Sequence, residues 1–306
     1  MKNVGFIYDD IFLKHGTPEW HPERKERLIQ ILSSLKKSGL WEKLIHIKPL
    51  KAAYDDIALV HTRDYIKRIE NFGTGYLDPD TYMSEDSLEA ALYAAGSLIE
   101  AAERCKKGEI ERAFCAVRPP GHHAESNRAM GFCIFNNVAI GARYAQKIGY
   151  KKVFIIDFDV HHGNGTQHIF ESDNTVFYFS THQYPHYPGT GEESEKGRGK
   201  GEKYTYNVPM PPGSGDKEYL SVYQNILPNL IKVFAPDITF VSAGYDIHKN
   251  DPLSDIRISD DGIREIVHSI LSCSPNPLVF TLEGGYNLSA LAESVRITLE
   301  EMLKDS

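Results

Sequence analysis

The pattern of apolar and polar positions alternates between two periodicities along the chain. Short, almost continuously apolar runs are typical of strands buried on both faces, and they occur at Val4–Tyr8, Ala113–Val117, Lys152–Phe158, Val176–Ser180, Ile238–Ser242 and Pro277–Leu282. Between them, apolar residues three and four positions apart predict helices from His21-Pro22 through Leu35, at Ser87–Cys105, Asn136–Ile148, Thr166–Phe170, Lys217–Phe234 (interrupted near Pro228), Asp260–Leu271 and Leu288–Leu303. This alternation predicts an α/β fold with a parallel sheet covered by helices on both faces.

The chain shows no internal repeat and no linker, so we expect residues 1–306 to form a single domain. The segment Gly189–Lys203 is rich in Gly, Glu and Lys, which predicts a solvated, mobile loop and makes it a candidate lid. The formal net charge of −8 argues against direct nucleic-acid binding, which requires a basic surface. The same charge is compatible with a cationic substrate.

The cysteines and the hydropathy pattern bear on the compartment. The four cysteines form no Cys-x-x-Cys pair, which argues against a zinc knuckle or a disulfide framework and fits a reducing cytoplasm. No apolar run approaches the roughly 20 residues of a membrane helix. The N-terminal segment becomes acidic at Asp9, too early for a signal peptide. We therefore expect a cytoplasmic protein without a membrane partner.

Four polar segments each follow one of the predicted strands. They are Arg118–His123, Asp157–Gly165, Gly244–Asp246 and Glu283–Tyr286. Ligand sites of open parallel sheets form beyond the carboxyl ends of the strands. The four segments are therefore expected to meet in one cleft.

A metal site is predicted at the second and third of these segments. Asp157, Asp159 and His161 alternate, so in an extended segment they point to one side. One carboxylate and one imidazole two residues apart, such as Asp159 and His161, can bind the same ion, and Asp246 can supply a third ligand. Three nitrogen or oxygen ligands with an open position are typical of a catalytic zinc site, where bound water has a pKa near ~7. The same ligands suit ferrous iron, and a buried charge network is the alternative interpretation.

The remaining two segments supply candidates for proton transfer and charge stabilisation. His122 and His123 are adjacent on a loop stiffened by two prolines, and either can carry a proton. Tyr286 follows two glycines, which permit a sharp turn, and its phenol can donate to an oxyanion. Taken alone, a histidine pair or a tyrosine after a turn is more often structural.

The motifs resemble those of the histone deacetylase superfamily, which includes acetoin-utilisation proteins and acetylpolyamine amidohydrolases. Arg-Pro-Pro-Gly-His-His and Asp-Phe-Asp-Val-His-His-Gly-Asn-Gly-Thr-Gln are specific to it. The resemblance implies an arginase-like, three-layer fold with a mostly parallel sheet of about eight strands. It also implies that Asp159, His161 and Asp246 hold zinc.

The same resemblance implies roles for the other site residues. His123 would take a proton from water and pass it to the leaving amine, while His122, oriented by Asp157, would mainly supply electrostatics. Tyr286 would stabilise the tetrahedral intermediate. Residues around the acyl-lysine tunnel would be Gly131, Phe132, Tyr187, Leu253 and, at its base, Arg27. Two potassium sites are also implied, the first at Asp157, Asp159, His161, Ser180 and Thr181, the second at Phe170, Asp173, Val176 and Tyr204.

One position departs from many members of this family. Asn164 stands where many carry an aspartate behind the second histidine, a feature that resembles the class II branch. A neutral partner is expected to leave His123 less basic than a carboxylate would. Tyr286 is retained, which implies an active enzyme rather than an inert acyl-lysine binder.

The expected activity is hydrolysis of an N-acetyl group on a lysine side chain of a peptide or protein, or on a similar small amine. An acetylpolyamine deacetylase is the alternative, although the apolar Leu253 offers no charge to a distal ammonium. A two-manganese ureohydrolase is a further alternative, but no Asp lies two residues past His161. The oligomeric state stays open.

Overall fold

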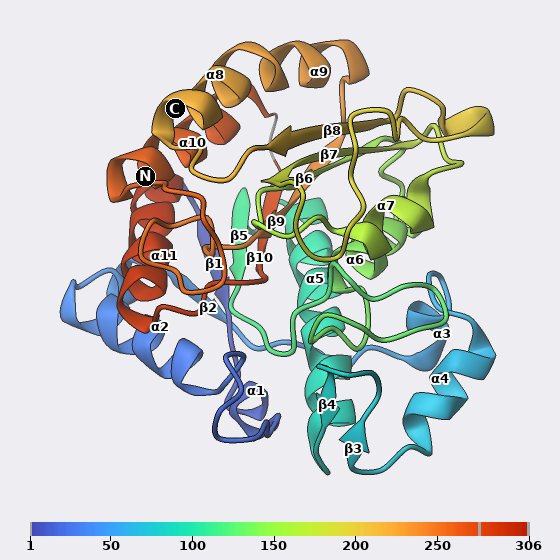
Figure 1. The fold of residues 1–306 in the computed structure, drawn as a ribbon. Helices are drawn as coiled ribbons and strands as arrows, with labels where there is room; N and C mark the ends of the chain where they lie inside the picture. The colour runs from blue at the N-terminus through green and yellow to red at the C-terminus, as the bar shows by residue number, and fades with distance from the viewer. Residues whose placement is uncertain (1, 275–276, 305–306) are drawn as a thin grey trace.

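The centre of the molecule is a parallel sheet, shown in Figure 1. The computed structural model describes residues 2–274 and 277–304. Within them the sheet has eight strands, all paired in parallel, in the order β2-β1-β5-β10-β9-β6-β7-β8. The strands are β1 Val4–Ile7, β2 Ile45–Ile47, β5 Arg112–Cys115, β6 Val153–Asp157, β7 Val176–Gln183, β8 Thr205–Met210, β9 Ile238–Ala243 and β10 Leu278–Leu282. The expected mostly parallel sheet of about eight strands is thus confirmed.

Helices cover both faces of this sheet. They are α1 Ile11–Lys14, α2 Glu26–Lys37, α3 Tyr54–Ile57, α4 Arg63–Glu70, α5 Ser87–Lys106, α6 Asn137–Lys147, α7 Asn164–Phe170, α8 Asp216–Asn225, α9 Leu227–Phe234, α10 Asp260–Cys273 and α11 Leu288–Leu303. Helices α5 and α6 pack together in one layer, and α2, α11, α10 and α8 form the other (Figure 1). A short hairpin of β3 (Gly75–Tyr76) and β4 (Tyr82–Met83) lies outside the sheet.

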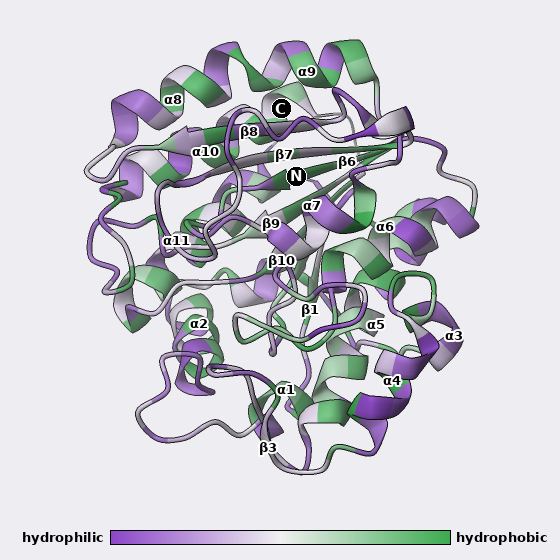
Figure 2. Cartoon of the chain, turned by 45° about the vertical axis from the view of Figure 1, so that its right-hand side comes forward, coloured by the Kyte–Doolittle hydropathy of each residue, from purple (hydrophilic) through white to green (hydrophobic). Residues whose placement is uncertain are grey.

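The burial of each element explains its sequence pattern. Every residue of β6, β9 and β10 is buried, because helices cover both sides of the sheet. Helices α8 and α9 mix hydrophobic and hydrophilic residues (Figure 2), because one face of each contacts the core and the other faces solvent. Side-chain caps from Asn136, Ser259 and Asn287 begin α6, α10 and α11.

The start of the second helix differs from the prediction at His21-Pro22, because α2 begins only at Glu26. The preceding residues turn so that the Glu23 side chain is fully buried against Arg118 and Arg27. The contact of Glu23 with Arg118, 95 positions away in the chain, therefore determines where α2 begins. The break near Pro228 is confirmed, since α8 and α9 are separate helices.

The segment Gly189–Lys203 is more firmly attached to the body than a solvated loop would be. The Thr190 hydroxyl is 2.7 Å from His162 Nδ1, and Glu195 accepts hydrogen bonds from Gln167 and from the backbone of Gly191. Its other residues are mostly exposed, and its role as a lid stays a prediction.

Two chemical expectations concern the whole chain. All four cysteines lie in the described part of the chain and none forms a disulfide. Across the same residues, every helix is too short or too polar to span a bilayer.

Candidate active site

Three side chains at adjacent strand ends form a cluster able to hold a metal ion. Asp159 and His161 follow β6, and Asp246 follows the neighbouring strand β9. His161 Nδ1 lies 3.2 Å from Asp159 Oδ1 and 3.1 Å from Asp246 Oδ2. One ligand atom from each residue falls within 4.8 Å of the others. The predicted trio is therefore brought together.

The surroundings of this cluster fit a cation. Burial and the Asp159 carboxylate together raise the pKa of Asp246 to about 7, because two carboxylates share a space without solvent. A divalent cation at that point would relieve their repulsion. The backbone leaves room for the carboxylates only because it lacks side chains there: a Cβ on Gly244 would lie 2.0 Å from Asp159 Oδ2, and one on Gly284 would lie 2.1 Å from Asp246 Oδ2.

The tandem histidines lie beside this cluster, with ring centroids 4.0 Å apart. His122 Nδ1 is 3.1 Å from Asp157 Oδ2, and His123 Nδ1 is 2.8 Å from Asn164 Oδ1. Burial opposes the charge on His122, but the carboxylates of Asp157 and Asp159 outweigh it and raise the pKa of His122 to about 10. Burial, together with the neighbouring His122, holds the pKa of His123 well below its usual value. The surroundings thus raise the pKa of one ring and lower that of the other.

Glu283, at the end of β10, holds the loop that carries these histidines. Its Oε2 accepts the backbone N–H groups of Gly121 at 2.7 Å and His122 at 3.2 Å. Its Oε1 accepts the Ser242 hydroxyl at 3.0 Å. Burial raises the pKa of the Glu283 carboxyl to about 7. The Glu-Gly-Gly-Tyr motif could have pointed to this residue, because a charged residue directly after a buried strand requires partners.

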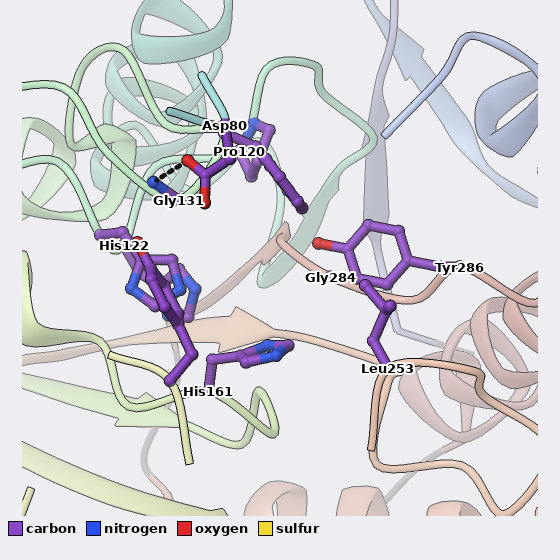
Figure 3. A pocket seen from close by; sticks show the side chains of 11 residues that line it. Asp80, Pro120, His122, Gly131, His161, Leu253, Gly284 and Tyr286 are labelled. Atoms are coloured by element: carbon purple, nitrogen blue, oxygen red, sulfur yellow. Dashed lines mark hydrogen bonds between the residues drawn. The ribbon is translucent and has the colours of Figure 1, made fainter. Parts of the chain in front are cut away.

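The histidines and His161 face a pocket of about 100 Å³, which Figure 3 shows from close by. The Tyr286 side chain enters from the side opposite His122, and its hydroxyl points into the space between them. Asp251 positions this tyrosine by accepting its backbone N–H at 2.7 Å. The other lining residues are Asp80, Pro120, His123, Gly131, Phe132, Tyr187, Leu253 and Gly284.

The four predicted wall residues, Gly131, Phe132, Tyr187 and Leu253, therefore all line one pocket. Asp80 lines it too and was missed. It reaches the pocket from the β3–β4 hairpin, and its Oδ1 accepts the Gly131 N–H at 3.2 Å. Burial and Asp78 raise its pKa to about 6. No sequence signal near the hairpin connects it to the strand-end motifs.

Arg27 is not among the residues that line this pocket, and its role at the base of the tunnel stays a prediction. Its Nε donates to the Gly285 carbonyl at 2.7 Å and its Nη2 to the Glu283 carbonyl at 2.5 Å. The guanidinium carbon is 5.1 Å from the centroid of the Tyr286 ring. In this position Arg27 holds the turn that presents Tyr286.

The residues expected at the first potassium site lie on neighbouring strands. Asp157 of β6 and Ser180 of β7 are register partners, and Thr181 follows. The hydroxyl groups of Ser180 and Thr181 contact His182 Nδ1 and the Tyr223 hydroxyl, both at 2.8 Å.

The residues expected at the second potassium site lie around the start of β7. The Asp173 N–H donates to the Phe170 carbonyl, and the Tyr178 N–H donates to that of Tyr204. The Asp173 carboxylate also accepts from Arg143 Nη1 at 2.5 Å.

A parallel α/β sheet with a possible metal-ligand cluster, two histidines and a tyrosine at one pocket is the arrangement expected of a metal-assisted hydrolase. The histone deacetylase domain matches residues 21–302, and the chain belongs to the histone deacetylase family. Members are deacetylases, which are amidohydrolases.

Individual relatives agree with this assignment. A probable deacetylase of Archaeoglobus fulgidus is 39% identical over 93% of this chain and 82% of its own length. Histone deacetylase 5 of Arabidopsis thaliana is 37% identical over 99% of this chain, which spans 49% of that longer protein. The crystal structure of the HDA15 HD domain superposes with a TM-score of 0.95 at 35% identity, covering 98% of this chain and 91% of the other.

Proposed function

We propose that the protein hydrolyses the acetamide of an N-acetylated lysine side chain, or of a similar amine, with zinc held by Asp159, His161 and Asp246. The observation that carries the proposal is that one narrow pocket is lined by His161 of the ligand cluster, by both tandem histidines and by Tyr286. Ferrous iron is the alternative metal, because these ligands suit both ions. A bound zinc ion polarises the amide carbonyl and lowers the pKa of water.

The side chains supply proton transfer and charge stabilisation. His123 holds its Nδ1–H toward Asn164, so its Nε2 is free to accept a proton from water and return it to the leaving amine. The Asp157 carboxylate beside His122 favours its protonated form, which would add positive potential. Burial raises the pKa of the Tyr286 phenol well above 10, so it keeps its proton and donates to the developing oxyanion.

The pocket walls favour an acyl-lysine over a polyamine. Phe132, Tyr187 and Leu253 offer apolar contacts suited to a lysine methylene chain. Leu253 carries no charge that could bind a distal ammonium group. Asp80 is the one carboxylate among the lining residues that could bind an ammonium group, and its Oδ1 also accepts the Gly131 N–H.

A comparison of substrates tests this preference. Purified zinc-loaded protein is expected to show a higher kcat/KM for an acetyl-lysine peptide than for acetylspermidine. Leu253→Glu should reduce the difference in kcat/KM between the two substrates, because it adds a charge that can bind the distal ammonium. A large polyamine advantage in the unsubstituted protein would refute the preference for acyl-lysine.

The ureohydrolase alternative requires a second metal bridged by further carboxylates. Within the described residues, Asp159, His161 and Asp246 form the one group of three or more His, Cys, Asp or Glu side chains close enough to share an ion. Metal analysis is expected to show one zinc-type ion per chain at this site.

We also propose that potassium binds at the two sites described above. From the cysteines, none of which forms a disulfide, we propose a cytoplasmic location.

A further inference from the structure

The partner of His123 is itself held by a carboxylate. The Asn164 side chain lies between two groups: its Oδ1 is 2.8 Å from His123 Nδ1, and its Nδ2 donates to Glu125 Oε1 at 2.6 Å. Asn164 is buried, and the Glu125 side chain is 13% exposed. On its outer side Glu125 contacts His168 Nδ1 at 2.9 Å. His123, Asn164 and Glu125 are therefore linked by hydrogen bonds in a chain that leads from the pocket toward the surface.

The chemistry of a carboxylate determines which groups donate and which accept in this chain of hydrogen bonds. An ionised carboxylate only accepts hydrogen bonds, so the amide nitrogen of Asn164 must face Glu125 and the amide oxygen must face His123. That oxygen in turn requires a proton on His123 Nδ1, which leaves Nε2 with a lone pair. If the amide turned over, its NH₂ group would face Nδ1, and the proton of a neutral His123 would move to Nε2. Such a ring has no lone pair at Nε2 for a proton from water.

Other contacts of the Asn164 amide are too weak to impose this direction. Its Nδ2 lies 3.4 Å from the His123 carbonyl, which is long for an N–H···O bond. It also lies 3.4 Å from Met130 Sδ, but a thioether sulfur is only a weak acceptor. The Glu125 backbone is held separately, because its N–H donates to the Arg128 carbonyl at 2.9 Å. Removal of the Glu125 side chain would thus release the amide while its own loop keeps its backbone hydrogen bond.

We propose that Glu125 is a positioning residue: through Asn164 it holds His123 in the tautomer whose Nε2 acts as the base. This inference rests on the proposed function. Glu125 also places a carboxylate one amide group away from His123, whose direct partner is the neutral Asn164.

Substitution of Glu125 tests this role by kinetics. Glu125→Ala is expected to lower kcat about 10- to 100-fold, within the ~10²–10⁴-fold that general acid–base catalysis contributes, with KM and zinc content unchanged. Glu125→Gln keeps an accepting oxygen for Asn164 and should stay within a few-fold of the unsubstituted enzyme. Asn164→Asp added to Glu125→Ala should recover kcat, because a carboxylate presents an acceptor to His123 in either orientation.

His168→Ala is the matched control, because it removes the outer contact of Glu125 and leaves the bond to Asn164 intact. It is expected to leave kcat and KM unchanged. Two results would overturn the proposal: an unchanged kcat in Glu125→Ala, or a loss that Asn164→Asp does not recover. The second result would show that Glu125 serves only to stabilise the fold.

Nitrogen NMR of histidine-labelled protein gives a readout that is independent of turnover. The His123 signals, assigned by their loss in His123→Gln, should show a proton on Nδ1 in the unsubstituted protein and a shift toward Nε2 in Glu125→Ala. An unchanged tautomer would refute the positioning role even if the protein proved inactive on acetyl-lysine. Inactivity combined with the predicted tautomer shift would instead contradict only the proposed function.

Discussion

At the scale of single residues, the absence of a side chain at position 131 is as important as any functional group. Gly131 has φ +56°, and a Cβ there would lie 2.4 Å from His123 Cδ2. Gly131→Ala is therefore expected to displace the His123 ring and lower kcat/KM at least tenfold, measured with an acetyl-lysine peptide. Gly213→Ala is the control: at φ +87° it carries a similar backbone cost of about 1–2 kcal/mol, but nothing lies within 4 Å. Equal activity losses in both variants would contradict this explanation.

The Tyr286 hydroxyl gives a second prediction at this scale. Tyr286→Phe should lower kcat about 10²–10³-fold, the usual effect of removing one oxyanion donor, while zinc binding stays intact. Tyr65→Phe, which removes a buried hydroxyl bonded to the Ile134 carbonyl, should leave kcat unchanged. A Tyr286→Phe enzyme with full activity would exclude the phenol as the donor.

The sequence predicted some of these residues well and others not at all. Asp159, His161, Asp246 and the two histidines lie in the segments that follow buried strands, so their convergence could be deduced from the topology of a parallel sheet. Asp80 and Glu125 lie in loops without such a signal. Their roles depend on contacts with residues 51 and 39 positions away, which only the folded chain brings together.

At the scale of elements, a buried ion pair joins the start of α2 to the loop after β5. Glu23 accepts from Arg118 Nε at 2.5 Å and from Nη2 at 2.8 Å, and all these side chains are fully buried. Glu23→Gln leaves the Arg118 charge without its partner and should lower the free energy of unfolding by about 3–5 kcal/mol. Urea denaturation would measure this change.

The exposed pair of Arg63 and Asp55, at 2.8 Å, provides the matched comparison. Asp55→Asn should change the free energy of unfolding by less than about 1 kcal/mol, because solvent screens exposed ion pairs. Similar changes at both sites would show that burial does not control the strength of the Glu23 pair.

Elements buried on both faces were predictable and edge elements were not. The five strands from β5 to β7 in the sheet order are almost continuously apolar, and each matches a predicted apolar run. The edge strands β2 and β8 were missed because they are short or partly exposed, with Tyr206 and Val208 only half-buried. The count of about eight strands came from family resemblance rather than from periodicity.

At the scale of the whole molecule, buried neutral histidines tie stability to pH. Burial lowers the pKa of His61 and His182 from 6.5 to about 4. The unfolded chain binds these protons below about pH 6.5 and the folded chain only below about pH 4, so stability falls as pH falls through this window. The free energy of unfolding should fall by about 3 kcal/mol for each of these two histidines as the pH falls from 6.5 to 4.

Urea denaturation at pH 7 and at pH 5 checks this expectation. His61→Gln keeps an acceptor for the Asn136 N–H, which His61 Nε2 accepts at 2.9 Å, and removes one titrating ring. The variant should lose less stability than the unsubstituted protein between these two values. An equal loss in both proteins would show that His61 does not contribute.

Turnover of an acetyl-lysine peptide as a function of bound zinc tests the central claim most directly. Protein stripped of metal should be inactive and regain full activity at one zinc per chain, whereas Asp159→Asn should neither bind zinc at that stoichiometry nor turn over substrate. Hydrolysis that is equally fast without metal, no hydrolysis by the zinc-loaded protein, or unchanged activity in Asp159→Asn would contradict the assignment of this site.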